Sequence, residues 1–525
     1  MLLFTAPLLR TALAMIVAVL VSATLMVRTA TAESPEDLFN DAGHSGPALF
    51  TFDAFVSESE AEDEPDPLPA TLPVPVEDFP KEPAEEPETD DSEDEETDSV
   101  TDRLDDIEEA LSQLEEDADA PPDHPTLEIG GRIHLESWWF ADDSPGIHFF
   151  EHPDTGVDPE NRVFFRRIRL ELQGEVWHNV IYRWQIDFAE PQDPTYKDVY
   201  IGFTELPIFQ TVIIGHHKRP LGLDHLNSSR FNVFIERPLV VEAFNEDARR
   251  LGVSSRGVSN DEMYSWEYGV YLLENIVDDG EYIGDSMQAS FNARLASSPW
   301  YDETSGGRGY FHWAIAGMVA DPDGDADPAD TNQNEARFRT RSELRSDERW
   351  LDTGRIPGAL AYEIVGLEAI FNAGALQIVG EYQSNWLQRD DTTPGTGPDL
   401  HFHGGYVYVA YMLTGEHVPY DREAGQIDRV QPFENFFLVE RCTGGLGRGW
   451  GAWQAALRYS FLDLTDHDIR GGVEHNTTIA LVWYFNAYAN LQFNAVYGDI
   501  EQHRPVGGFT DGHFTALGTR LRLDF

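Results

Sequence analysis

The sequence predicts an all-β protein, a transmembrane antiparallel β-barrel of 16 strands, with an N-terminal disordered acidic segment and a short coiled coil before it. Three observations predict this fold. Runs of alternating apolar and polar residues recur from residue 126 to the last residue, which is typical of strands with one apolar face. Many runs approach the roughly 9–11 residues that a tilted membrane strand needs. Aromatic residues gather at the ends of the runs, where a barrel meets its two lipid interfaces.

The N-terminus predicts export. Arg10 is followed by an apolar run that begins at Thr11, and Ala30-Thr31-Ala32 offers a cleavage site. We interpret residues 1–32 as a cleavable signal peptide, with an uncleaved membrane anchor as the alternative. No later apolar run approaches the ~18 residues of a membrane helix. An exported chain of this kind can still cross a membrane as a barrel, whose signal in each strand is weaker.

The charge of the chain is strongly negative, with 94 acidic and 36 basic residues and a net charge of −58. Residues 33–125 hold 34 of the acids against only Lys81 and Arg103, and residues 126–525 keep a net charge of −28. Nucleic acid is excluded as a partner because its phosphates need a basic surface. Residues 33–99 are acidic, rich in proline and poor in aromatics, so we expect them to be disordered. Cys442 is the single cysteine, which excludes an intrachain disulfide.

A short heptad pattern follows at residues 100–118. Its apolar residues are spaced alternately four and three apart, and they are Val100, Leu104, Ile107, Leu111 and Leu114. Leucine at position a with isoleucine at position d favours three or four helices over two. Arg103 and Glu108 are placed to pair between chains, as in short trimeric coiled coils. The pattern predicts a homotrimer, with a single amphipathic turn of no consequence as the alternative.

The segment Asn161–Phe188 shows the alternation most clearly. Two runs flank a short turn at 177–179, as in an antiparallel hairpin. The apolar face carries Ile168, Leu170, Leu172, Gly174, Val176, Tyr182, Trp184, Ile186 and Phe188. The opposite face carries charged residues, among them Arg167, Arg169, Glu171, Glu175, Arg183 and Asp187. In a soluble sandwich the charged face would be the outside, whereas in a membrane barrel the apolar face meets lipid and the charged face lines water.

The strand count rests on one segment. Seventeen segments show the alternation, and the weakest is Ala336–Leu344, where arginines crowd together. A barrel of this type has an even number of strands, so removing this segment leaves 16, the size of a porin with an aqueous channel. Connections alternate between short ones, such as 177–179, and long polar ones, such as 220–246 and 321–335, as expected of periplasmic turns and outer loops. Phe525 ends the last strand.

Six segments occur in order along the chain: NRVFFRRIRLELQGEV, KDVYIGF, GHHKRPLGL, YMLTGE, GAWQAALRYSFLDL and LGTRLRLDF. Together they resemble the phosphate-selective porin O and P family, over residues 126–525. The resemblance implies a homotrimeric 16-stranded barrel in the outer membrane, with loops folded inward as a constriction. Phosphate-binding members of that family have a ladder of pore arginines and clusters of lysines. This chain has only Lys81, Lys197 and Lys218, so a lysine cluster is absent and arginine would have to replace it as the phosphate ligand.

The candidates for lining and selectivity are basic residues of the expected barrel: Arg167, Arg169, Arg183, Lys218, Arg219, Arg337, Arg339 and Arg341, with Arg345 next to the last group. The first three share the polar face of the hairpin, and the arginines after 336 would form an inward-folded eyelet. A net charge of −28 favours cations at the mouth, but basic residues at the narrowest point would outweigh it. The alternative is structural: these arginines pair with Glu171, Glu175, Asp187 and Glu343 across the wall.

Other patterns give weaker candidates. Asp321, Asp323, Asp325 and Asp327 are spaced as in calcium loops, but the glycine and the bidentate glutamate of such loops are misplaced, so a solvated acidic loop is the preferred interpretation. The pairs His216-His217 and His401/His403 lack a third metal ligand. No G-x-S-x-G elbow or other nucleophile spacing indicates an enzyme.

We therefore expect a trimeric outer-membrane porin without a cofactor, which passes small hydrophilic solutes by diffusion and whose arginines bias the pore toward anions such as phosphate. Its partners would be membrane lipid, other copies of the chain and small anionic or neutral solutes. The alternative is a structural anchor, in which a plugged barrel tethers the envelope through the acidic segment and the coiled coil.

Overall fold

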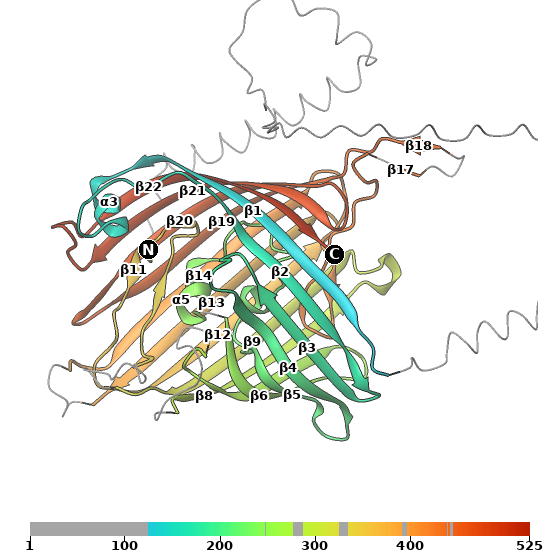
Figure 1. The fold of residues 1–525 in the computed structure, drawn as a ribbon, viewed down its shortest axis with the longest axis horizontal. Coiled ribbons are helices and arrows are strands. Elements are labelled where there is room, and N and C mark those ends of the chain that lie inside the picture. The colour runs from blue at the N-terminus through green and yellow to red at the C-terminus, as the bar shows by residue number, and fades with distance from the viewer. Residues whose placement is uncertain are drawn as a thin grey trace, which may run out of the picture. The chain divides into compact units, whose positions relative to one another are not determined.

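Sixteen antiparallel strands form a closed barrel in the computed structural model, which describes residues 124–246, 248–276, 287–324, 334–390, 396–437, 439–440 and 445–525. Each barrel strand pairs with the next, and the first pairs with the last (Figure 1). The strands are β1 (Glu128–Asp143), β2 (Arg162–Trp177), β3 (Val180–Asp187), β4 (Thr195–Leu206), β5 (Gln210–Lys218), β6 (Arg249–Val258), β7 (Tyr264–Leu272), β8 (Ala289–Tyr301), β9 (Gly309–Asp321), β12 (Ala359–Ala373), β13 (Leu376–Arg389), β14 (Leu400–Met412), β19 (Ala452–Asp466), β20 (Ile469–Tyr484), β21 (Ala489–His503) and β22 (Gly512–Asp524). The predicted fold class and strand number are confirmed. The segments 1–32, 33–99 and 100–118, together with Asp325 and Asp327, lie outside the described residues.

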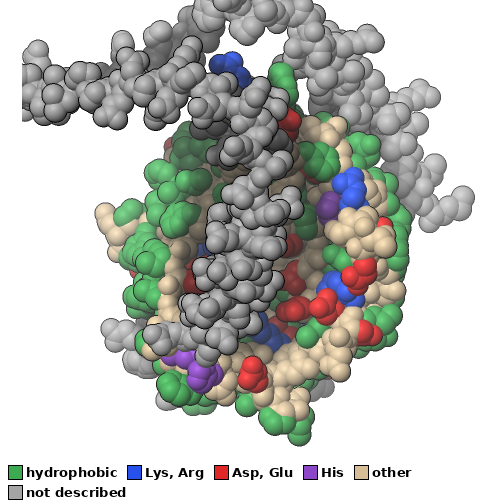
Figure 2. Space-filling model, turned by 90° about the vertical axis from the view of Figure 1, so that its right-hand side faces the viewer, with side chains coloured by type: hydrophobic (Ala, Val, Ile, Leu, Met, Phe, Trp, Pro, Cys, Tyr) green, Lys and Arg blue, Asp and Glu red, His purple; other side chains and the backbone are tan. Residues whose placement is uncertain are grey.

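The alternation of side chains sorts apolar residues to the outside of the barrel. In the β2–β3 hairpin, Leu170 is 42% exposed and Val176 is 51% exposed, whereas Arg167 and Glu171 on the inner face are each 5% exposed. Figure 2 shows hydrophobic side chains around the outside of the ring and charged side chains toward its hollow. A water-soluble protein would not expose so many large apolar side chains, but a lipid-facing wall requires them.

The two ends of the barrel differ in their connections. We call the end where β1 begins and β22 finishes the terminal end, and the opposite one the loop end. At the terminal end six connections are short, from the turn at 178–179 to the turn at 485–488. The seventh, 413–451, is long, so the expected division into short turns and long outer loops fails there. Gly131 and Phe525 close the barrel, because each donates its backbone N–H to the carbonyl of the other.

Two connections from the loop end fold into the lumen. The first, 219–248, carries α4 (Leu223–Leu226) and α5 (Leu239–Phe244), and α5 lies inside the ring of strands (Figure 1). Gly222 lets it turn inward, because its φ is +88° and a Cβ there would lie 2.1 Å from Glu381 Oε1 on β13. The second, 322–358, carries β10 (Arg339–Thr340), which pairs with β11 (Leu351–Asp352) and not with the wall. Excluding Ala336–Leu344 from the barrel strands is thereby confirmed.

The long connection at the terminal end also enters the lumen. It carries β15 (Tyr420–Asp421) paired with β16 (Gln426–Ile427), and β17 (Val439–Glu440) paired with β18 (Leu446–Gly447). Wall residues hold its first part: Tyr310 Oη donates to Val418 O at 3.0 Å, and Arg294 Nη2 donates to Gly425 O at 2.9 Å. Ile427 N donates to Asn227 Oδ1 at 3.1 Å. The inward segments from the two ends therefore meet inside the barrel.

Short helices complete the fold. At the loop end α3 (Pro145–Glu151) buries Ile147 and Phe150, and Ile147 packs against Gly512 of β22. At the terminal end a 3₁₀ turn, η1 (Glu303–Ser305), joins β8 to β9. Within the described ranges, no helix has the length and apolar character of a membrane span.

Candidate functional site: an arginine-lined corridor

Two cavities inside the barrel share four arginines. The first has a volume of about 630 Å³ and reaches the loop-end residues Glu190 and Asp193. The second has a volume of about 210 Å³ and reaches Gln426 of the terminal-end insertion. Both are lined by Arg167, Arg169, Arg237 and Arg249. We treat them as one passage and call it the arginine corridor.

The arginine corridor lies along one half of the lumen. Every barrel-strand residue that lines it comes from β1–β7, and the rest of the lining comes from the inward connections and from the loop-end connections 188–194 and 273–288. On the other half, from β12 to β22, inward side chains such as Gln377, Gln383, Asn385 and Gln492 are fully buried beneath those connections. The lumen thus divides into an open half and a packed half.

The lining of the arginine corridor is predominantly basic. Thirteen basic side chains face seven carboxylates among the described lining residues. The basic residues are Arg132, Arg166, Arg167, Arg169, Arg183, Lys197, Lys218, Arg237, Arg249, Arg256, Arg341, Arg345 and Arg349, and the acids are Asp187, Glu190, Asp193, Asp198, Glu236, Glu242 and Glu267. The lining therefore has a formal excess of six positive charges, although the chain as a whole is acidic.

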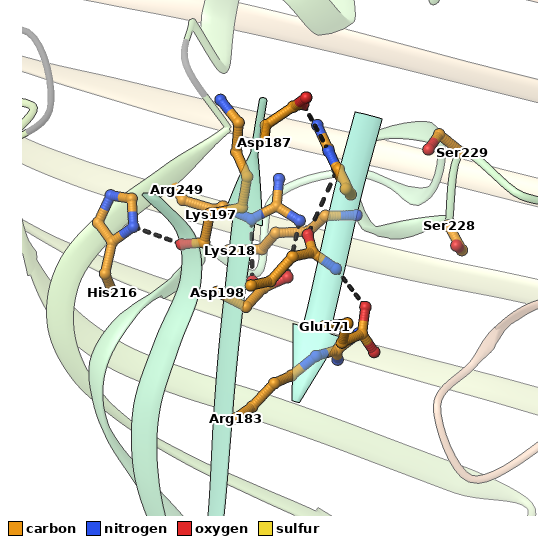
Figure 3. A network of polar contacts seen from close by, with 12 residues as sticks. Glu171, Arg183, Asp187, Lys197, Asp198, His216, Lys218, Ser228, Ser229 and Arg249 are labelled. Carbon is orange, nitrogen blue, oxygen red and sulfur yellow. Dashed lines mark hydrogen bonds and ion pairs between the residues drawn. The ribbon is translucent and has the colours of Figure 1, made fainter. Parts of the chain in front are cut away.

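Several corridor arginines are paired with carboxylates. Arg169 Nε lies 2.7 Å from Asp187 Oδ2, and Arg183 Nη2 lies 2.6 Å from Glu171 Oε1. Arg249 makes a two-pronged contact with Asp198, at 2.9 Å and 2.8 Å. Figure 3 shows the carboxylates of Glu171, Asp187 and Asp198 interleaved with these basic groups along adjacent strands. Pairing fixes each guanidinium in place and partly neutralises its field.

Arg167 and Arg345 differ from these arginines. No carboxylate of the described residues lies within ion-pairing distance of either guanidinium. Arg167 is 5% exposed, its Nη1 lies 3.2 Å from His134 Nδ1, and its Nε has no hydrogen-bond partner. Since it lines both cavities, Arg167 presents an uncompensated charge where they join.

The other basic residues predicted from the sequence fall into three groups: one lines the corridor and pairs with a carboxylate, one lines it and binds backbone carbonyls, and the rest lie outside it. Arg341 lines the first cavity and pairs with Glu242 at 3.3 Å. Lys218 lines the second, but its Nζ donates to the carbonyls of His225, Leu226 and Asn227, so it holds α4. Arg219 is buried and lines neither cavity. Arg337 pairs with Asp352 and Arg339 with Glu246, and neither lines the corridor.

Six corridor arginines were not among the sequence candidates for lining: Arg132, Arg166, Arg237, Arg249, Arg256 and Arg349. Arg345, expected in the eyelet, lines the first cavity. For Arg132 a signal exists, because alternation in the first strand places it on the polar face. For Arg237 and Arg349 none exists, because both lie on connections whose inward folding depends on tertiary contacts.

The inward connections are fixed by buried ion pairs. Glu236, in the connection 219–248, accepts hydrogen bonds from Arg166 and Arg520, both at 3.0 Å. Burial opposes ionisation of this carboxyl, but the two guanidinium groups outweigh it and hold the pKa of Glu236 well below its usual range. Glu343, in the connection 322–358, pairs with Arg458 of β19 at 2.6 Å. The connections 219–248 and 322–358, which supply part of the corridor lining, are therefore also held firmly in place.

The histidine pairs and the acidic loop that the sequence suggested lie in separate places. His217 bonds to Ser254 and His401 to Ser384. Across the described ranges, no group of three histidine, cysteine, aspartate or glutamate side chains is arranged to hold a metal ion. Of the suggested calcium loop, Asp321 ends β9, and the backbone N–H of Asp323 donates to Gln288.

Comparison with known proteins places this barrel among porins. Residues 144–525 match the family model described as phosphate-selective porin O and P. An uncharacterized protein of Caulobacter vibrioides is 29% identical over 373 residues, which is 69% of this chain and 68% of the relative. Porin O of Pseudomonas aeruginosa is 23% identical over 437 residues, 76% of this chain and 88% of the relative.

Among solved structures, the trimer form of OmpT, an outer membrane protein of Vibrio cholerae, is similar to 76% of this chain and to 99% of its own, with a TM-score of 0.43 at 10% identity. The family match covers most of the chain. The chain therefore belongs to the phosphate-selective porin O and P family, and it is a diffusion channel of the outer membrane.

Proposed function

We propose that this porin selects anions, and oxyanions such as phosphate in particular, through the arginine corridor. The observation that supports this proposal is the composition of the lining. It has thirteen basic groups and seven carboxylates, although residues 126–525 as a whole have a net charge of −28. A permeating ion responds to the field at the constriction more than to the net charge of the whole molecule. Guanidinium groups also match the geometry of phosphate oxygens, which suits a pore with few lysines.

The pairing pattern supports passage rather than tight capture. An anion would move along arginines whose charge is partly balanced by Asp187, Glu171 and Asp198, so no single point holds it strongly. Conduction requires binding that is favourable enough for entry and weak enough for exit. Arg167 lines both cavities and has no carboxylate within ion-pairing distance, so its charge would attract the anion without a carboxylate beside it. Selection of this kind is electrostatic, and we infer that the protein catalyses no reaction.

The proposal predicts that Arg167→Gln shifts the reversal potential of the purified protein toward cations in planar bilayers under a KCl gradient. The physical reason is that one uncompensated charge leaves the corridor. Arg504→Gln is the matched control, because it removes the same charge from an exposed position outside the corridor and should leave the reversal potential unchanged. An unchanged potential in Arg167→Gln would count against a selective role for this arginine.

The same recordings test the preference for oxyanions. Inorganic phosphate added to a chloride solution should reduce the chloride current of the wild type, and it should do so less in Arg167→Gln. A wild-type pore that prefers K⁺ to Cl⁻ would overturn the proposal. The absence of conductance steps would instead favour the alternative of a plugged structural anchor.

We also propose that the porin is a homotrimer with strands β3–β7 at the centre, a surface we call the short wall. These strands have 8–12 residues, whereas the other barrel strands have 13–16. Nine residues tilted by 45° span roughly 20 Å, less than the ~25 Å apolar band of a lipid-facing wall. Ile201, Ile214, Val253 and Val270 are nonetheless 47–55% exposed on it. Contact with other copies would cover them, in agreement with the trimeric heptad pattern.

A further inference from the structure

Aromatic side chains gather against the outside of the wall at the terminal end, beside the connection 413–451. We call this group the terminal aromatic surface: Phe436, Phe437, Trp450, Trp453, Trp483 and Phe485. Trp453 of β19 and Trp483 of β20 belong to the outward-facing positions of their strands, and their rings stack at 4.9 Å. Phe436 contacts Trp483 edge-on at 4.6 Å. The connection therefore continues the lipid-facing aromatic belt beyond the strand ends.

Hydrogen bonds fix this part of the connection to the wall. Phe436 N donates to Phe485 O at 2.6 Å, and Trp483 Nε1 donates to Trp450 O at 2.8 Å. A backbone bridge joins Phe436 to Gly449. Phe437 has a φ of +58°, a conformation that an aromatic residue rarely adopts. The backbone thus holds the aromatic rings in set positions on the outside of the barrel.

The outer rings of this group have little protein around them. Phe437 is 51% exposed and Trp450 is 63% exposed, although both are large and apolar. Tryptophan is enriched at the level of the lipid headgroups, where its ring meets hydrocarbon and its N–H meets water. A phenylalanine ring beside it has no polar atom and is accommodated by the hydrocarbon. Continuity with the belt formed by Trp453 and Trp483 places Phe437 and Trp450 at that level.

We propose that the terminal aromatic surface is a membrane-binding foot, which seats residues 436–437 and 449–450 of the connection in the headgroup region of the periplasmic leaflet. The occupant of the surface is the lipid bilayer itself. The first part of the same connection, residues 418–427, constricts the lumen and is held by the inner wall. The foot would hold the second part in lipid, so that the connection would be fixed at both parts.

Tryptophan fluorescence in proteoliposomes tests this proposal. The emission of Trp450 is obtained as the difference between wild type and Trp450→Phe, each reconstituted in phosphatidylcholine with or without bromine atoms on the acyl chains. We expect brominated lipid to quench this difference emission by more than half, with shallow bromines quenching more than deep ones. Aqueous iodide should quench it little.

Two other tryptophans calibrate the measurement. Trp386, 43% exposed on the lipid-facing side of β13, should be quenched by brominated lipid when isolated with Trp386→Phe. Trp350, 1% exposed inside the lumen, should not. If iodide but not brominated lipid quenches Trp450, the surface faces water and the proposal is wrong. If neither quenches it, a protein surface covers it, such as a second copy of the chain, and the proposal is also wrong.

Discussion

At the scale of single residues, Arg458 joins the two connections that narrow the pore from the loop end. Its Nη2 donates to Glu343 Oε2 at 2.6 Å and its Nη1 to Glu236 O at 3.1 Å, while the guanidinium lies 4.3 Å from the ring of Phe234. Glu343 also accepts a hydrogen bond from Thr478 at 2.9 Å, and both partners of the ion pair are essentially unexposed. Arg458 does not line the corridor, so its effect on permeation is through the position of other residues.

Breaking this pair should therefore change both stability and pore width. Glu343→Ala leaves Arg458 buried without its carboxylate partner, which typically costs about 3–5 kcal/mol, and it removes the ion pair that holds the segment carrying Arg341 and Arg345 against β19. We expect a lower unfolding temperature in detergent and a larger single-channel conductance. Glu348→Ala is the control, because that exposed side chain belongs to the same connection. Equal conductance in both variants would contradict an anchoring role for Glu343.

Sequence reasoning at this scale located part of the corridor. Alternation placed Arg167, Arg169 and Arg183 on the polar face of a hairpin, and all three line the corridor. Alternation does not distinguish a charged side chain that faces the solute from one that holds the backbone. Lys218 lies in the lining, but its ammonium group donates to three backbone carbonyls at the end of α4. That distinction depends on where connection 219–248 folds, which no local pattern encodes.

At the scale of elements, the insertion from the terminal end is the largest departure from expectation. Short turns were expected on that side, and 413–451 instead sends Val418, Tyr420 and Ile427 into buried positions. Strand β6 was also hard to recognise, because only Leu251 and Val253 mark its apolar side. Period-two alternation identifies strands that face lipid, but it carries no information about connections that pack inside the barrel.

Replacing residues 416–428 by a short glycine-serine linker should open the pore. Val418, Tyr420 and Ile427 are buried inside the barrel, and we expect water to enter the space that their removal leaves. We expect a clear increase in single-channel conductance together with a weaker ion preference. As a control, the same linker in place of residues 153–158 at the loop end, most of which are exposed, should leave conductance near the wild-type value. An unchanged conductance in the first variant would show that the insertion lies aside from the ion path.

At the scale of the whole molecule, the short wall predicts where subunits meet. Val253→Lys puts a charge on the short wall, where a neighbouring copy would bury it at a cost of several kcal/mol. We expect this variant to lose trimers in mild detergent, as measured by light scattering on a sizing column. Val319→Lys, on the outward face of β9 in the taller wall, is the matched control and should remain trimeric. Trimers in both variants would exclude the short wall as the contact.

The class and strand number of the molecule were predictable because every strand repeats the same physical requirement, one face for lipid and one for water. Oligomeric contact was harder to place, since a wall that meets another subunit is as apolar as a wall that meets lipid. Only the lengths of β3–β7, measured against the thickness of a bilayer, distinguish the two surfaces.

The division of the lumen into an open half and a packed half has a consequence for how such a porin can change over generations. We expect substitutions of corridor residues that hold no inward connection, such as Arg167, to alter the solute that passes, while the buried amides and ion pairs between β12 and β22 keep the barrel folded. Arg166 and Lys218 serve both demands, because they line the corridor and also hold the connection 219–248. We therefore expect a lineage to acquire a new permeant through residues of the first kind, one substitution at a time, without first endangering its assembly.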